Sequence, residues 1–191
     1  MSKQALRQEM RKLLKSLPNT SKLIANEKIE KLLLNHEKVK SSQHITFFYG
    51  LEKLVELDTV DIIDALLKQG KDVYLPIMSE NIKRQMWFNY VTKDWKQTLI
   101  QNNFGLQEPK LDHSKSPSKI DLMILPGLAF NKEDLTRLGR GGGFYDTFLL
   151  EYEKIHGCQP YKLAIGFECQ NLGVEIPMDE FDVKVDEILL V

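Results

Sequence analysis

The sequence predicts an α/β protein: a three-layer α/β/α single domain with a mainly parallel central sheet. Segments with helical spacing of apolar residues alternate with short β-rich runs along the chain, as they do in βαβ units. One run, residues 120–125, is largely apolar and ends at Pro126-Gly127, which is typical of a central, buried strand. No internal repeat or low-complexity segment divides residues 1–191, so we expect one domain.

Helices are predicted from apolar residues that recur every three or four positions. The segments are residues 2–16, 20–35, 57–69 and 144–155. Ser2 is a suitable N-cap for the first helix, and Pro18-Asn19 separates it from the second. Gly70 supplies a C-terminal stop for the third.

Strands are predicted from short runs rich in β-branched and aromatic residues. The runs are residues 44–49, 73–76, 85–91, 120–125, 161–167 and 187–191. The third run mixes aromatic and polar side chains, so we expect it nearer an edge of the sheet. Residues 108–119 are polar, contain two prolines and are predicted to form a loop, whose length permits a lid over a substrate without requiring one. The order of the strands does not follow from these patterns.

The composition narrows the possible functions. Lys and Arg total 26 against 27 for Asp and Glu, so no overall charge favours nucleic acid or a membrane surface as partner. Two cysteines are too few for a disulfide framework, and the histidines do not have zinc-ligand spacing. The N-terminus lacks the apolar core of a signal peptide, and no run approaches the roughly 18 apolar residues of a membrane span. We therefore expect a cytoplasmic protein; the balanced charge does not exclude a small anionic ligand, which needs only a local cluster of positive groups.

The most informative segment follows the apolar run. Residues 137–146 read RLGRGGGFYD, and a helical pattern begins directly afterwards. Glycines let several backbone amides approach one anion, and a helix start adds free N–H groups and the positive end of its dipole. Arg137 and Arg140 add planar donors suited to phosphate or carboxylate oxygens. The segment is neither a P-loop nor a dinucleotide fingerprint, and by spacing alone a flexible turn is the alternative. With two arginines in it, phosphate binding is favoured.

Asp146 would repel phosphates bound at this segment unless a cation lay between them. Mg²⁺ fills that role, because it bridges phosphate oxygens while taking one or two protein carboxylates. The alternative is an acidic residue in the first turn of a helix, which stabilises the helix dipole. The residues alone leave both interpretations open.

Taken together, these segments resemble the 5-formyltetrahydrofolate cyclo-ligase family, also called methenyltetrahydrofolate synthetases. The resemblance is carried by Leu125-Pro126-Gly127-Leu128-Ala129-Phe130 followed by Arg137 to Asp146, and it extends over nearly the whole chain. It includes Lys3 and Arg7, residues 49–51 and 56–59, Leu75-Pro76 and residues 181–186. Some relatives have lysine where Gly142 stands and a tyrosine pair where Phe144-Tyr145 stands, so neither that charge nor that hydroxyl is expected to be essential.

The resemblance implies a role for each matching position. The residues implied in ATP binding are Lys3, Arg7, Arg137, Leu138, Gly139, Arg140, Gly141, Gly142, Gly143, Phe144 and Tyr145. Those implied in folate binding are Leu51, Glu56, Arg140, Gly141, Gly142, Gly143 and Phe144. Asp146 and Asp182 are the implied magnesium ligands, and Arg140 and Tyr145 the implied catalytic residues. Without the resemblance, Lys3 and Arg7 would pass for a solvated helix face, Glu56 for a helix start and Asp182 for a surface acid.

The implied reaction is the ATP-dependent conversion of 5-formyltetrahydrofolate to 5,10-methenyltetrahydrofolate. The absence of a Gly-x-Ser-x-Gly motif agrees with it, because the substrates supply every nucleophile. Two alternatives remain at this point: an enzyme of the phosphosugar isomerase or CoA-transferase type on a similar scaffold, and a non-catalytic folate- or nucleotide-binding module. We expect a monomer or weak dimer; the sequence does not indicate the polyglutamate length preference or which divalent cation is used in the cell.

Overall fold

The computed structural model describes residues 1–50, 55–79, 81–103 and 105–191. Its helices are α1 (Lys3–Ser16), α2 (Asn19–Asn35), α3 (Glu37–Ser41), α4 (Val60–Lys68), α5 (Trp95–Thr98) and α6 (Phe144–His156). Its strands are β1 (His44–Thr46), β2 (Asp72–Met78), β3 (Met86–Tyr90), β4 (Leu99–Gln101), β5 (Gln107–Pro109), β6 (Leu122–Leu125), β7 (Ala129–Asn131), β8 (Thr136–Leu138), β9 (Tyr161–Gly166) and β10 (Glu187–Leu190). Short 3₁₀ helices are η2 (His113–Lys115) and η3 (Glu168–Gln170).

The central sheet has six strands in the order β10-β9-β6-β1-β2-β3. All neighbouring pairs are parallel except β2 and β3, which are antiparallel. This confirms the predicted mainly parallel sheet, with β6 inside it and β3 at an edge. The chain passes from β1 to β2 and β3 on one side and then to β6, β9 and β10 on the other. Strands β2 and β3 are thus added on one side of β1, and the later strands are added on its other side, beginning with β6. The direction in which strands are added reverses between β1 and β6.

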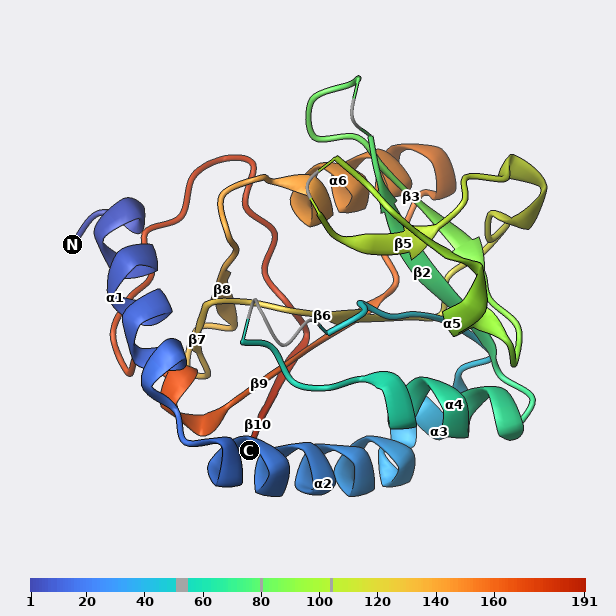
Figure 1. Ribbon diagram of the computed structural model, residues 1–191. Coiled ribbons are helices and arrows are strands. Elements are labelled where there is room, and N and C mark those ends of the chain that lie inside the picture. The colour runs from blue at the N-terminus through green and yellow to red at the C-terminus, as the bar shows by residue number, and fades with distance from the viewer. Residues whose placement is uncertain (51–54, 80, 104) are drawn as a thin grey trace.

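Helices cover both faces of the sheet, as the three-layer prediction requires (Figure 1). Alternate residues of a strand point to opposite faces, so Val73 and Leu75 of β2 pack in one apolar core while Tyr74 packs in the other. The first core contains buried residues of α1, α2 and α4, and the second contains Leu149 and Tyr152 of α6. Burying apolar surface on both faces fixes the sheet between the two helical layers.

Several predicted boundaries shift where side chains bind the backbone. Ser2 caps α1 as predicted, because its Oγ accepts the N–H of Ala5 at 3.2 Å. The strand predicted over 44–49 ends at Thr46, and the residues after it leave the sheet. The helix predicted from residue 57 begins at Val60, since Asp58 accepts the Val60 N–H at 2.9 Å and the Thr59 hydroxyl binds the backbone of Phe48 and Gly50.

Several short pieces of structure were not predicted, α5 and η3 among them. The segment predicted as a loop over 108–119 begins in β5, which pairs with β4, and contains η2. Arg137 and Leu138 lie in β8, which forms an antiparallel hairpin with β7 and lies before the glycine-rich turn rather than in it. The helix α3 was also missed. Elements of three to five residues are too short to show a period, and they form because tertiary neighbours complete them.

Candidate active site

A cavity of about 220 Å³ opens at the carboxyl ends of β1 and β6. Phe48 and Tyr49 line it just after β1, and Pro126 and Gly127 line it just after β6. Strand addition reverses direction between these two strands, and ligands of open parallel α/β sheets bind at such a point. The fold itself therefore marks this cavity as the candidate site.

The cavity has mostly apolar walls. Met78 of β2, Met86 of β3 and Phe144 of α6 contribute to them. Glu108 of β5 is a buried carboxylate in the wall, and its Oε2 accepts the N–H of Met78 at 3.1 Å and a side-chain N–H of Asn102 at 2.8 Å. Apolar walls with a few fixed polar groups suit a flat heteroaromatic ligand.

The glycine-rich turn forms one side of the cavity and leads from β8 into α6. Gly141 and Gly143 have φ of 108° and 70°, in the left-handed region that residues with a side chain rarely adopt. Gly143 occupies the N-cap of α6 and has no side chain with which to cap it. The first N–H groups of α6 therefore need another acceptor, and an anion at the turn would supply one.

The helix α1 holds this turn with two arginines from one of its faces. Arg7 Nε donates to the carbonyl of Gly139 at 2.9 Å, and a guanidinium nitrogen of Arg11 donates to the carbonyl of Arg140 at 3.2 Å. A β-carbon on Gly141 would lie in ordinary contact with Arg7, 3.5 Å from its guanidinium carbon, so the positive φ of Gly141 rather than lack of space favours glycine there. The positive charge of α1 thus lies directly against the turn.

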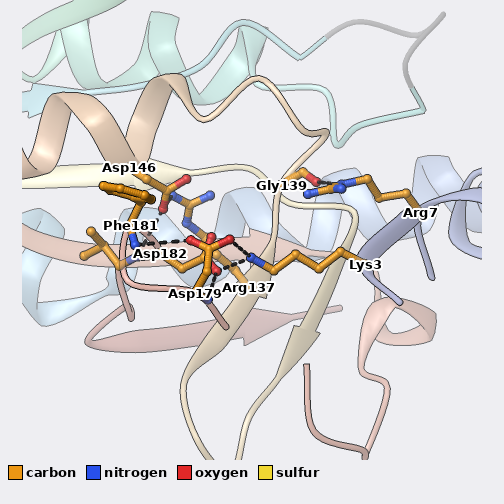
Figure 2. A network of polar contacts seen from close by, with 9 residues as sticks. Lys3, Arg7, Arg137, Gly139, Asp146, Asp179, Phe181 and Asp182 are labelled. Carbon is orange, nitrogen blue, oxygen red and sulfur yellow. Dashed lines mark hydrogen bonds and ion pairs between the residues drawn. The ribbon is translucent and has the colours of Figure 1, made fainter. Parts of the chain in front are cut away.

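The two predicted magnesium ligands lie in one polar network with Lys3 and Arg137 (Figure 2). Oδ1 of Asp146 accepts from Arg137 at 2.8 Å and from the N–H of Val183 at 3.2 Å, which brings the segment after Asp182 beside α6. Asp182 is paired with Lys3 and accepts the N–H of Asp179 at 2.7 Å. Lys3 also contacts Asp179 at 2.8 Å.

The charges of this network stabilise one another. Burial alone would lower the pKa of Lys3, but its hydrogen bonds to Asp179 and Asp182 raise that pKa above the ordinary value. The hydrogen bond from Lys3 lowers the pKa of Asp179. Lys3 therefore keeps its positive charge within this network.

Two carboxylates fit Mg²⁺ that arrives with phosphates. Within the described residues, no group of three or more His, Cys, Asp or Glu side chains could hold a metal without a ligand. Mg²⁺ commonly takes one or two carboxylates and completes its octahedron with phosphate oxygens and water. Asp146 and Asp182 each use a single carboxylate oxygen in the contacts above, which leaves the other oxygen for a metal.

Arg140 reaches from the turn into the cavity. Its Nε and a terminal nitrogen lie 3.0 and 2.9 Å from Oε1 of Glu56, and both residues line the cavity. Arg140 and Glu56, two of the residues assigned to folate by the resemblance, are thus brought together. Leu51, the other residue assigned to folate outside the turn, lies outside the described residues.

Tyr145 and Arg137 form the floor of the site beneath the turn. Burial raises the pKa of Tyr145 well above its usual range, and the carboxylate of Glu56 raises it further. Tyr145 therefore keeps its proton at neutral pH, so its hydroxyl can donate a hydrogen bond but does not serve as a base. The guanidinium of Arg137 lies 5.9 Å from its ring centre, and Nε of Arg137 is buried with no acceptor in the part of the chain that the structure describes.

The structure brings together the predicted residues that it describes, around one turn and one cavity. Sequence reasoning missed Arg11, Asp179 and Glu108. Arg11 is one helical turn beyond Arg7, so extending the face of Lys3 and Arg7 by four residues would have found it. Asp179 and Glu108 have no local signal, because only the folded chain places them here.

Comparison with known proteins identifies the family. The family model described as "5-formyltetrahydrofolate cyclo-ligase family" matches residues 1–191. A 5-formyltetrahydrofolate cyclo-ligase of Haemophilus influenzae is 30% identical over 190 residues, covering 98% of this chain and 97% of that protein. One from Mus musculus is 29% identical over 192 residues, covering 98% of this chain and 93% of that protein.

Solved structures show the same fold. A 5,10-methenyltetrahydrofolate synthetase from Aquifex aeolicus superposes with a TM-score of 0.79 at 23% identity, covering 98% of this chain and 89% of the other. One from Mycoplasma pneumoniae has a TM-score of 0.71 at 21% identity, covering 98% of each chain. Because a family model matches from the first residue to the last, the chain belongs to the 5-formyltetrahydrofolate cyclo-ligase family.

Proposed function

We propose that this protein is a ligase that uses ATP and Mg²⁺ to cyclise 5-formyltetrahydrofolate to 5,10-methenyltetrahydrofolate, releasing ADP and phosphate. One observation carries the proposal. A glycine-rich turn surrounded by cations borders an apolar cavity, and Arg140 reaches from the first into the second. A triphosphate on the turn and a pterin in the cavity would then meet at Arg140.

The chemistry requires activation of a poor electrophile. The formyl oxygen attacks the γ-phosphorus of ATP, and ADP leaves with the electron pair of the broken P–O bond. N10 of the same folate then attacks the formyl carbon, and phosphate departs with the former formyl oxygen. N10 loses its proton, and a methenyl bridge joins N5 and N10. No protein nucleophile takes part.

The protein contributes position and charge. The amides at the start of α6, with Lys3, Arg7, Arg137 and Arg140, hold the triphosphate and stabilise the charge that develops during phosphoryl transfer. Holding the formyl oxygen against the γ-phosphate contributes several kcal/mol by proximity alone. Mg²⁺, bound with ATP by Asp146 and Asp182, would neutralise phosphate charge in the same place.

The folate is recognised on the cavity side. We assign the pterin to the apolar cavity, with Glu56 accepting its N–H donors and Arg140 released from Glu56 to face the formyl oxygen and the γ-phosphate. Tyr145 keeps its proton because burial raises its pKa, and it donates a hydrogen bond to the reacting oxygens. The charge of Arg140 thus moves from a protein carboxylate to the substrates.

We also propose a domain organisation, an oligomeric state and a cellular location for this activity. We expect residues 1–191 to act as one catalytic domain, as a monomer or weak dimer in the cytoplasm. Among the helices that the structure describes, none combines the length and apolarity needed to cross a bilayer. The isomerase, CoA-transferase and binding-module alternatives gain no support from the comparisons, which name cyclo-ligases.

Incubation of the purified protein with 5-formyltetrahydrofolate, ATP and Mg²⁺ tests the proposal. The methenyl product has its own near-ultraviolet absorbance, which should appear only when ATP is present. Product formation without ATP would point to an isomerase or transferase chemistry, and binding without product would point to a non-catalytic module. Either result would overturn the proposed reaction.

A further inference from the structure

Arg84 approaches the glycine-rich turn at Gly143, two residues beyond the glycine that Arg7 of α1 approaches. It lies in the turn between β2 and β3, outside the residues on which the family resemblance was based. A β-carbon on Gly143 would lie 3.4 Å from both Cδ and Nε of Arg84 and 3.7 Å from its guanidinium carbon. The side chain of Arg84 thus lies against the N-cap of α6, where the proposed triphosphate meets the first helical amides.

The backbone at Arg84 is held in an unfavourable conformation. The N–H of Gln85 donates to the carbonyl of Ile82 at 3.3 Å, so residues 82–85 form a turn with Arg84 at its third position. Arg84 has φ of 64° there, as in a type II turn, in which glycine or asparagine is preferred at this position. An arginine at this position is not explained by the turn itself.

Arg84 is also an uncommitted cation. Its side chain is exposed and donates no hydrogen bond to any residue that the structure describes. Asp179, which accepts from Lys3 and from the N–H of Phe181, is close enough to feel its charge. By contrast, Lys3, Arg7, Arg11, Arg137 and Arg140 all have protein acceptors. Arg84 can therefore receive an anion without first breaking a bond.

We propose that Arg84 is a further ATP-binding residue, whose guanidinium closes on the triphosphate at the N-terminus of α6. The inference rests on the proposed function, because it needs phosphates on the turn. A planar guanidinium binds two phosphate oxygens at once, and an exposed hairpin lets it close after the nucleotide has entered. Arg84 then sets the affinity for ATP and not that for folate.

Steady-state kinetics of Arg84→Gly provides the test, because glycine suits the turn and removes only the side chain. We expect the KM for ATP to rise roughly tenfold or more, as for loss of a charge-assisted hydrogen bond. The KM for 5-formyltetrahydrofolate should not change appreciably, and the melting temperature should not fall, because glycine suits the left-handed conformation at this position. Arg84→Lys should restore part of the ATP affinity, since it returns the charge without the planar fork.

Lys83→Ala is the matched control, since it removes the neighbouring exposed cation of the same turn. Its KM for ATP should change by less than about twofold, as expected for a screened surface charge. An active wild type whose KM for ATP is unchanged by Arg84→Gly, or raised equally by Lys83→Ala, would overturn the role of Arg84 alone. A wild type that neither turns over nor binds ATP with Mg²⁺ would overturn the proposed function, and the role of Arg84 with it.

Discussion

The carboxylates at the two ends of the parallel sheet have different hydrogen-bond partners. At the amino ends of the strands, Asp121 accepts the N–H groups of Gln43 and His44 at 3.0 and 2.9 Å and contacts Lys119 at 2.8 Å. At the carboxyl ends, Asp146 and Glu56 accept instead from Arg137 and Arg140, side chains that we assign to phosphate. Asp121 thus has two backbone partners beside Lys119, whereas Asp146 has one, the N–H of Val183, and shares its bonded oxygen with an arginine that we assign to phosphate.

The difference distinguishes a carboxylate that stabilises the fold from carboxylates that we assign to the reaction. A carboxylate bound to backbone N–H groups has a fixed partner, because those groups cannot turn elsewhere without unfolding the strand ends. A carboxylate bound to a flexible cation can exchange that cation for Mg²⁺ while the cation takes a phosphate. In this account the ion pairs at the carboxyl ends hold the charges of the site together until the nucleotide and its metal replace each partner.

Of the variants considered, Arg140→Ala should lower the catalytic rate most. It removes the side chain that links the turn to the cavity, so kcat should fall by about 10³-fold, within the range for loss of one transition-state donor. Initial rates at saturating ATP and folate measure the effect. Lys119→Ala removes a cation from the other end of the sheet and should leave the rate unchanged. A normal rate in Arg140→Ala would refute its assignment.

Asp146→Asn should have the next largest effect. The amide keeps the shape but loses the charge that pairs with Arg137 and that we assign to Mg²⁺, so the rate should fall by about 10²-fold at fixed Mg²⁺. The Mg²⁺ concentration needed for half-maximal rate should rise in parallel. Asp121→Asn is the matched control at the amino end, and an equal loss of rate in both variants would contradict the division between the two ends.

Arg11→Ala should have a smaller effect, because Arg11 acts through the carbonyl of Arg140 rather than on the substrates. We expect the KM for ATP to rise roughly threefold, since the lost hydrogen bond is exposed and worth less than about 1 kcal/mol. Lys12→Ala, which changes the next residue of the same helix, should not alter the KM. Equal values for both variants would mean that α1 acts only through its total charge.

Asp121→Asn should lower stability without changing the rate. Burial alone would raise the pKa of Asp121, but the N–H groups of His44 and Gln43 and the ammonium of Lys119 lower it to about 2. The charged form is therefore favoured in the folded state, and the variant should lose about 1 kcal/mol at pH 7, less than the full shift implies because water screens the group.

The pH dependence of that loss follows from the lowered pKa. The stabilisation is fully present above the pKa of the unfolded chain, about 4, and is lost as the pH falls towards 2. Urea unfolding of the wild type and of Asp121→Asn should thus give curves that differ at pH 7 and converge at low pH. A constant difference at every pH would show that the carboxylate charge contributes nothing.

Long periodic segments made most of the fold predictable. The helices α1, α2, α4 and α6 and the strands of the central sheet follow from apolar spacing, because each buries one face or both. The hairpins β4–β5 and β7–β8 did not follow, since three residues show no period and their pairing depends on distant contacts. Strand order depends on the whole chain and was likewise beyond the sequence.

The site was predictable only where it is local. Arg137 and Arg140 lie among glycines, and that spacing favours phosphate binding, whereas the residues alone left a metal role for Asp146 open. Asp182 and Lys3 are distant in sequence and became candidates through family resemblance, while the fold shows why they meet. No sequence pattern pointed to Arg84, because its position beside Gly143 depends on how the β2–β3 hairpin packs in the folded chain.

Calorimetric titration of the wild-type protein with ATP, with and without Mg²⁺, tests the exchange of ion partners most directly. We expect ATP to bind saturably in the presence of Mg²⁺ and clearly more weakly without it. Without Mg²⁺, Asp146 and Asp182 would lose their cationic partners to the phosphates and gain no metal in return. No measurable binding of ATP in the presence of Mg²⁺ would contradict the account.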